Sequence, residues 1–347
     1  MSSYTLRVLE RTDDGGVLKF VCVDDGDTTI YTSASTGATP TPGSTLTGIG
    51  STVLEVLQLP LLADGDDTPG IYVAAGSAQA SWGGCALFRS TDGGTTFAEI
   101  AQITKRATLG VIQDLPNTWR GGNTVDPGGV TVQLMGAGDL ESVTHALLLA
   151  GSNLALIGNE VVQFKAASLV GTLKYQLTGL LRGRLGTESA IGTQVIGDRF
   201  ILLDDAVARV DSPLSLLGRT VIYRAVSLGN AVTAGADVSA TETQTSLLPL
   251  DPVDLRCYSN GSAYVATWKR RTRIPSQWAN GGDVPLGEAS ERYRVRVSFG
   301  PTYDVDTEVT TTTATFGTGS NFSGYTLTVQ QVSDRVGLGN TASISIG

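Results

Sequence analysis

Apolar and polar residues alternate over short stretches along most of this chain, which is the period of a half-buried β-strand rather than of a helix. Near the start, Tyr4, Leu6 and Val8 fall on one face, and residues 17–23 form a second run of β-favouring residues. An Asp-Asp-Gly-Gly turn sequence at 13–16 separates the two runs. This order predicts a β-hairpin.

Further short runs of β-branched residues lie between glycines and predict more strands. They cover residues 71–75, 86–88, 130–134, 161–164, 173–177, 200–203 and 221–226. Residues 53–57 fit either a strand or one short helix, and both remain open. Residues 32–51 predict a long loop, and residues 227–245 a weakly patterned crossing into the last domain.

The best helix candidate covers residues 140–150, with Asp139 as its N-cap and Gly151 as its stop. The only histidine of the chain, His145, lies in this segment. Among apolar neighbours it is interpreted as a packed helix residue. Catalysis by a Ser-His-Asp triad would depend on this one imidazole, and so would a metal site built on several histidines.

The final part of the chain has the clearest alternation. Tyr293, Val295 and Val297, continued by Phe299, alternate with polar residues, and a Trp-containing strand at 265–268 precedes them. Two more strands are predicted: one carries Tyr325, Leu327 and Val329, and one carries Ala342, Ile344 and Ile346 after a turn at 337–340. The order and spacing of these strands resemble a fibronectin type III domain.

Composition agrees with the strand pattern. The chain has 347 residues, more than one usual domain, and its 43 glycines fit short strands joined by tight turns. We therefore predict a mainly β protein of several β-sandwich or barrel units with few short helices. The expected domains are 1–111, 112–246 with the short helix, and 247–347 as the fibronectin-type-III-like sandwich.

The formal net charge of -9 argues against a nucleic-acid partner, because phosphate binding needs a surplus of Lys and Arg. The three cysteines, Cys22, Cys85 and Cys257, are too few and too far apart for a disulfide framework and are interpreted as buried apolar residues. No apolar run is long enough to predict a membrane-spanning segment, and residues 1–4 lack the features of a signal peptide.

Sequence motifs of common enzymes are missing, including a nucleophile elbow, a phosphate loop and a C-x-x-C pair. Two acidic clusters, 24–27 and 64–67, are interpreted as exposed turns, with a weak calcium site or a glycoside hydrolase pair as the alternatives. Residues 90–97 are similar to the Asp-box of sialidases and predict a hairpin turn. We expect no enzyme activity, no cofactor and no metal.

A basic run at 269–273 lies between Trp268 and Trp278. Its arginines, Arg270, Arg271 and Arg273, are expected to pair with carboxylates across the following insertion, where Asp283, Glu288 and Glu291 are the candidates.

Three co-linear strings carry a further resemblance. They are Leu-Leu-Arg-Gly-Arg-Leu-Gly-Thr-Glu at 180–188 with Phe-Ile-Leu-Leu-Asp at 200–204, Gly-Asn-Glu-Val-Val-Gln-Phe at 158–164, and Trp-Lys-Arg-Arg-Thr-Arg at 268–273 with Val-Pro-Leu-Gly-Glu-Ala at 284–289. Together they resemble the carboxy-terminal part of the large tail-tip, or baseplate hub, proteins of gene transfer agents and siphophages. Residues 53–62 and the box at 90–97 fit the same order.

This resemblance implies a structural virion protein at the distal end of a tail, assembled in the host cytoplasm. It also implies a homo-oligomer, with a trimer expected, that contacts other tail proteins and a host receptor or glycan. Arg182 and Arg184 would then clamp carboxylates, and Glu188 would lie beside them. Longer family members have additional amino-terminal hub and hydrolase-like domains, so we expect a split gene or part of a larger protein, and carry over no hydrolase activity.

Two other functions remain open at this point. One is a glycan-binding adhesin that uses Trp82, Trp119 and Trp278 on exposed loops. The other is a glycoside hydrolase that uses the acidic clusters.

Overall fold

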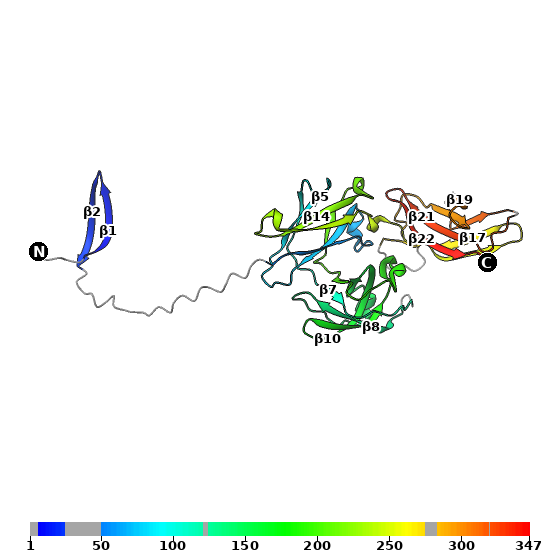
Figure 1. Ribbon diagram of the computed structural model, residues 1–347, viewed down its shortest axis with the longest axis horizontal. Helices are drawn as coiled ribbons and strands as arrows, with labels where there is room; N and C mark the ends of the chain where they lie inside the picture. Colours follow the sequence, from blue (N-terminus) through cyan, green and yellow to red (C-terminus); the bar gives the residue numbers. More distant parts are fainter. Residues whose placement is uncertain (1–5, 25–49, 121–123, 275–282, 319) are drawn as a thin grey trace. The chain divides into compact units, whose positions relative to one another are not determined.

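The computed structural model describes residues 6–24, 50–120, 124–274, 283–318 and 320–347. The chain forms two compact units, residues 1–48 and 49–347. The described residues form 22 strands, a single α-helix and short 3-10 helices, which confirms the predicted mainly β class (Figure 1).

The first unit contains a hairpin of β1 (Leu6–Asp14) and β2 (Val17–Asp24). Asp14 pairs with Val17 across Gly15 and Gly16, which both have positive φ angles. The predicted hairpin is thus confirmed over its described residues. Its apolar side chains are exposed, and so is Cys22, which corrects the interpretation of all three cysteines as buried. A hairpin of two strands has no second layer against which to bury a side chain.

The second unit begins with a sandwich of two sheets, called the first sandwich. One sheet has the order β13-β4-β3 and the other β15-β14-β5-β6. The strands are β3 (Val53–Leu57), β4 (Gly70–Gly76), β5 (Cys85–Ser90), β6 (Ala98–Ile103), β13 (Ala208–Asp211), β14 (Thr220–Ser227) and β15 (Ala236–Thr241). Residues 53–57 are therefore a strand. Val73, Leu87 and Tyr223, from both sheets, share one buried core.

A closed barrel is inserted between β6 and β13, with the strand order β10-β11-β8-β7-β12-β9. Its strands are β7 (Leu109–Ile112), β8 (Asp126–Leu134), β9 (Leu154–Ile157), β10 (Glu160–Gly171), β11 (Lys174–Leu181) and β12 (Arg199–Leu202) (Figure 1). Phe164, Leu177 and Phe200 fill its interior. A second cluster joins Leu57 and Tyr72 of the first sandwich to Leu156 of the barrel, so the two modules share a core.

This insertion divides the chain differently from the expected ranges 1–111 and 112–246. Strands β13, β14 and β15 belong to the same sheets as β3–β6, although the barrel separates them in sequence. Residues 227–245 contain β15 rather than only a crossing. Partner choice between strands is a tertiary property that the alternation within one strand does not encode.

The predicted helix is shorter than expected. Helix α1 covers His145–Leu149, and its N-cap is Thr144, whose Oγ1 accepts a hydrogen bond from the amide of Leu147 at 3.3 Å. Asp139 instead accepts from the hydroxyl of Tyr175 at 3.0 Å. His145 is exposed, so its interpretation as a packed residue was wrong. Leu148 is the one buried residue of this helix, so most of the helix, including His145, lies at the surface.

The last module is the C-terminal sandwich, with sheets β16-β17-β20 and β19-β18-β21-β22. Its strands are β16 (Val253–Ser259), β17 (Tyr264–Lys269), β18 (Tyr293–Ser298), β19 (Tyr303–Val309), β20 (Thr313–Phe316), β21 (Thr326–Ser333) and β22 (Gly337–Ser345). The first, second and fifth strands form one sheet and the other four the second. This is the arrangement of a fibronectin-type-III-like sandwich, as predicted.

The buried face of that sandwich follows the predicted alternation. Trp268 packs on Tyr293 with 5.2 Å between ring centroids, and Val295 and Val297 are fully buried. Phe299 is exposed because β18 ends one residue earlier, and the turn expected at 337–340 lies before Gly337, which begins β22.

The 3-10 helices are η2 (Asp64–Asp66), η3 (Arg184–Gly186), η4 (Glu188–Ala190), η5 (Leu214–Leu216), η6 (Val232–Ala234) and η7 (Thr245–Leu247). None of the helices in the described part of the chain has the length and apolarity that a bilayer crossing requires.

Candidate functional site

The string at 180–188 spans the end of β11 and a tight loop through η3. Gly183 and Gly186 have φ angles of 57° and 86°. A Cβ atom on Gly183 would lie 2.9 Å from the Cα of Glu188, and one on Gly186 would lie 2.4 Å from Cδ2 of Leu250. Glycine is therefore required at both positions by backbone angle and by space.

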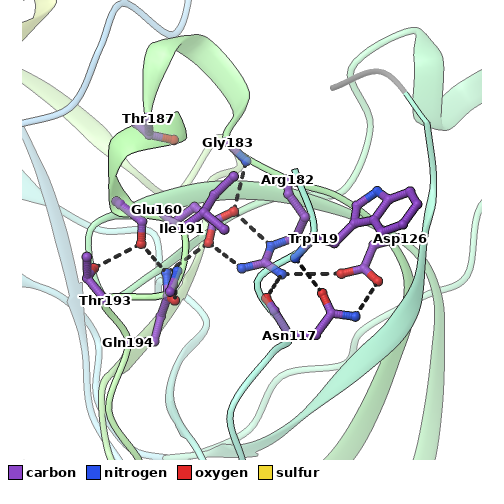
Figure 2. Close-up of polar contacts among 12 residues, drawn as sticks. Asn117, Trp119, Asp126, Glu160, Arg182, Gly183, Thr187, Ile191, Thr193 and Gln194 are labelled. Atoms are coloured by element: carbon purple, nitrogen blue, oxygen red, sulfur yellow. Dashed lines mark hydrogen bonds and ion pairs between the residues drawn. The ribbon is translucent and has the colours of Figure 1, made fainter. Parts of the chain in front are cut away.

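Arg182 lies at the centre of a buried ion cluster, called the buried clamp, with Glu160 and Asp126 (Figure 2). Its Nε and Nη2 donate to the two carboxylate oxygens of Glu160 at 2.8 and 2.7 Å. Its Nη1 donates to Asp126 at 3.2 Å and to the carbonyl oxygen of Asn117 at 2.6 Å. The side chain of Arg182 is 1% exposed, and those of both acids are 0% exposed.

Neutral donors add further hydrogen bonds to the carboxylate of Glu160. Glu160 accepts from the amide of Gly183 and from Nε2 of Gln194, both at 2.8 Å (Figure 2). Burial by itself lowers the pKa of Arg182, but the hydrogen bonds and charges of Glu160 and Asp126 outweigh it and raise the pKa. Because Asp126 begins β8, Glu160 begins β10 and Arg182 follows β11, the cluster fixes one end of the barrel.

Arg271 connects the C-terminal sandwich with the barrel. Its Nη2 donates to Oε1 of Glu188 at 2.7 Å, and its Nη1 to Oδ1 of Asp251 at 3.0 Å. Burial, and to a lesser degree the charge of Glu188, raises the pKa of Asp251, although Arg271 opposes the shift. Two motifs that the sequence suggested separately therefore meet in one ion triad.

Arg273 connects the same segment with the first sandwich. Its Nη1 donates to Oδ1 of Asp67 at 2.7 Å, and its Nε donates to Oε1 of Glu288 at 3.0 Å. Arg335 donates to the other oxygen of Asp67 at 3.1 Å. Burial raises the pKa of Asp67, but Arg273 and Arg335 together lower it below its ordinary value.

The other residues that the sequence analysis singled out have separate partners. Arg270 pairs with Asp283 within the C-terminal sandwich, and the expected pair of Arg273 and Glu288 forms. The third candidate carboxylate, Glu291, accepts instead from the hydroxyl of Tyr293. Arg184 lies in η3 near Glu188, whose charge raises its pKa while burial, the larger effect, lowers it.

Sequence reasoning missed the acids that complete these contacts. Glu160 lies inside the string at 158–164, and Asp67 inside the acidic cluster at 64–67, so both were noted without their roles. Asp126 and Asp251 carried no signal. We name the contacts of Arg271 and Arg273 with Glu188, Asp251, Asp67 and Glu288 the arginine junction.

The other sequence candidates lie elsewhere. Trp82 is buried and donates to Oγ1 of Thr52 at 2.8 Å, so it is not on an exposed loop. Trp119 is 39% exposed, whereas Trp278 lies outside the described residues, as do residues 25–27 of the first acidic cluster. In the ranges that the structure describes, no group of three His, Cys, Asp or Glu side chains could hold a metal ion.

The box at 90–97 forms the predicted hairpin turn between β5 and β6. The carboxylate of Asp92 accepts hydrogen bonds from Oγ of Ser90, from the amides of Thr95 and Thr96 and from the hydroxyl of Thr96, at 2.6–3.1 Å. The bonds from Thr96, the largest effect, lower the pKa of Asp92. The guanidinium of Arg224 lies over the ring of Phe97 at 3.9 Å.

Comparison with known families gives one match. Residues 107–201 fit the model of a family described as "Rcc01698-like, C-terminal". The matched range covers the barrel, from just before β7 to Ile201 within β12, and includes the whole buried clamp. No curated protein sequence matches this chain.

Solved structures that resemble this chain include domains d3–d4 of the extracellular region of rat CD45, with 14% identity over 36% of this chain and 63% of that one. A fragment of titin has 8% identity over 85% of this chain and 99% of its own length, and the FN1–FN3 domains of chicken CNTN1 have 9% over 86% and 99%. All three TM-scores are 0.22, so these similarities support no conclusion about function.

Proposed function

We propose that this chain is a structural protein of a tailed phage or gene transfer agent particle, located in the distal tail tip or baseplate hub. The observation that carries the proposal is the convergence of three strings, at 158–164, at 180–188 and at 268–273 with 284–289, each of which resembles that family. Their charged residues belong to the buried clamp and the arginine junction. The family match over the barrel supports the same assignment.

The charged residues of this site suit a structural role. The buried clamp has every carboxylate oxygen and three guanidinium nitrogens in hydrogen bonds, which leaves no free group for turnover. The arginine junction links three modules through side chains that are partly shielded from solvent. Shielded, hydrogen-bonded ion pairs lose little strength to salt, which fits a particle exposed to changing surroundings.

Oligomerisation around the tail axis, as a trimer, and contact with other tail proteins or a host receptor are part of this proposal and rest on the family resemblance. Of the three tryptophans of the adhesin alternative, Trp82 is buried, Trp119 is 39% exposed and Trp278 lies outside the described residues, so only one of these rings is known to lie at the surface.

Purified particles from the host provide the test. Mass spectrometry should detect the chain in stoichiometric amounts, and an antibody against the C-terminal sandwich should label the distal end of the tail in electron micrographs. The same antibody on particles from a deletion strain is the control. Particles that are complete and infectious without the chain would overturn the proposal.

A further inference from the structure

The C-terminal sandwich and the other two modules of the second unit have separate hydrophobic cores in the described residues. The core of the C-terminal sandwich consists of residues between 255 and 346. The clusters of the first sandwich and the barrel, including the one that joins those two modules, lie between residues 54 and 240. Domains of one chain move relative to each other unless a large apolar interface joins them. The C-terminal sandwich therefore depends on other contacts for its position.

Charged side chains supply such contacts. Arg273 and Arg335 of the C-terminal sandwich both donate to the carboxylate of Asp67, which precedes β4 of the first sandwich. Arg271 donates to the carboxylate of Glu188 on the barrel. The side chains of Asp67 and Glu188 are 30% and 45% exposed, so water reaches both acids at the edge of the boundary. Two acids thus hold three arginines of the C-terminal sandwich.

The packing beside these ion pairs is open. Cavities of about 750 and 220 Å³ lie at the boundary, and Leu185, Leu250 and Thr272 line both of them. Protein interiors are close-packed and have few voids larger than a water molecule. The residues that line such voids lack dispersion contacts on one side. Shape complementarity therefore contributes little to holding the C-terminal sandwich in place.

The connection between the modules has a short stretch at which the chain can turn. Leu250 is buried and packs so closely on Gly186 that a Cβ atom there would lie 2.4 Å from its Cδ2. The chain up to Leu250 therefore stays with the barrel. The sandwich begins with Val253, the first residue of β16. Rotation of the backbone at residues 251–252 would move all strands of the C-terminal sandwich together.

Two of the arginines also have a carboxylate on their own side of the boundary. The Nε of Arg273 donates to Glu288 of the same sandwich at 3.0 Å, and the Nη1 of Arg271 donates to Asp251 in the connection at 3.0 Å. A guanidinium has five N–H donors, so one arginine can serve an acid on each side at once. When the contacts across the boundary break, neither arginine becomes the uncompensated charge that makes many buried pairs costly to separate.

We propose that the C-terminal sandwich is a latched module that turns as a rigid body about residues 251–252, with Asp67 and Glu188 as the latch. In the closed state, which this structure shows, the two acids hold the arginines. In the open state the sandwich keeps its own core, and water solvates the two acids. The inference goes beyond the proposed function and does not depend on it. Within a particle, the latch lets this module change its orientation without unfolding.

Hydrogen exchange of the full chain, measured by NMR, tests the proposal. The amide of Asn340 is the reporter, because it donates across the boundary to the carbonyl oxygen of Pro249 at 2.9 Å. The amides of β18, which pairs on both sides within the sandwich, report unfolding instead. Combining Asp67→Asn with Glu188→Gln should speed exchange at Asn340 by about tenfold or more, the equivalent of at least one charge-assisted hydrogen bond, and leave β18 unchanged.

Both substitutions lie outside the C-terminal sandwich, so its own ion pairs stay intact. Each single variant should give a smaller acceleration of the same sign, which keeps the test valid if the double variant does not fold. Asp237→Asn is the matched control, because it removes the partner of Arg224 within the first sandwich and should leave exchange at Asn340 unchanged.

A distance measurement shows the movement directly. Spin labels are placed at Ser168→Cys on β10 and Ser343→Cys on β22, both exposed positions, in a chain whose Cys22 and Cys257 are replaced by alanine. Pulsed electron spin resonance should give one main distance with the latch intact. The double variant should add a second population of distances.

The proposal is overturned if the double variant exchanges Asn340 at the rate of the unchanged chain. It is also overturned if Asn340 and β18 accelerate equally, because the sandwich then does not move as a separate body, or if the double variant keeps a single distance. None of these results depends on whether the chain is found in particles, so failure of the latch and failure of the proposed function can be told apart.

Discussion

Replacing Arg182 by methionine should destabilise the barrel more than any other single loss of charge in the described residues. Methionine retains most of the aliphatic volume, but the four hydrogen bonds of the guanidinium disappear. Glu160 and Asp126, both fully buried, then remain without a cation. Removing one partner of a buried pair costs about 3–5 kcal/mol. Since whole domains are stable by only about 5–15 kcal/mol, this is a large fraction.

Urea denaturation of Arg182→Met should therefore show a strongly lowered midpoint. Hydrogen exchange of the amides in β10 and β11 should accelerate, which reports on the barrel even if the sandwiches unfold separately. Arg256→Met is the matched control, because Arg256 pairs with Asp254 while its side chain is 72% exposed. An exposed pair contributes about 0–1 kcal/mol.

The reasoning also predicts how Arg182→Met combines with Glu160→Gln. Once Glu160 is neutral, less uncompensated charge is left behind, so the double variant should lose less stability than the sum of the single losses by about 0.5–3 kcal/mol. Strict additivity, or a loss below about 1 kcal/mol for Arg182→Met alone, would refute the view that the buried clamp holds this end of the barrel.

Four further predictions concern other parts of the chain. Gly186→Ala should lower the urea midpoint more than Gly197→Ala. Both glycines have positive φ, but only a Cβ at position 186 would meet a side chain, at 2.4 Å from Cδ2 of Leu250, and equal effects would show that the loop adjusts. Asp67 has a lowered pKa in the folded state, so its charge stabilises the fold above its ordinary pKa of about 3.9, and this contribution is lost as the pH falls through the folded value. In acid titrations, Asp67→Asn should therefore weaken the dependence of the free energy of unfolding on pH between about pH 5 and 2, and an unchanged pH profile would contradict the contact. Asp92→Ala should speed proteolysis within residues 90–97, whereas Lys19→Ala, in the other unit, should not, as mass spectrometry of the fragments can show. A maleimide at pH 8 should label exposed Cys22 quickly and leave Cys85 unlabelled in the folded chain, since burial raises the pKa of Cys85 to about 11; fast labelling of Cys85 would mean that the first sandwich opens.

Local pattern determined much of this fold. Alternation at Tyr293, Val295 and Val297 predicted a buried strand face, because side chains point to opposite sides of a strand with a period of two. The Asp-Asp-Gly-Gly turn predicted the first hairpin, since Gly15 and Gly16 adopt positive φ angles. The predicted position of helix α1 was correct, but the predicted range was too long. A helix of so few turns has too little periodicity for its ends to be predicted from the sequence.

Which strands share a sheet was decided only by tertiary structure. Strand β14 pairs with β5, although all the barrel strands lie between them in the sequence. The alternation of β14 does not differ from that of a strand that pairs with its neighbour in sequence. The same holds for the charges. Arg271 and Glu188 are 83 residues apart, and Arg273 and Asp67 are 206 apart. A chain with 33 acids offers every arginine many chemically equivalent partners, and only the packing of the modules selects one.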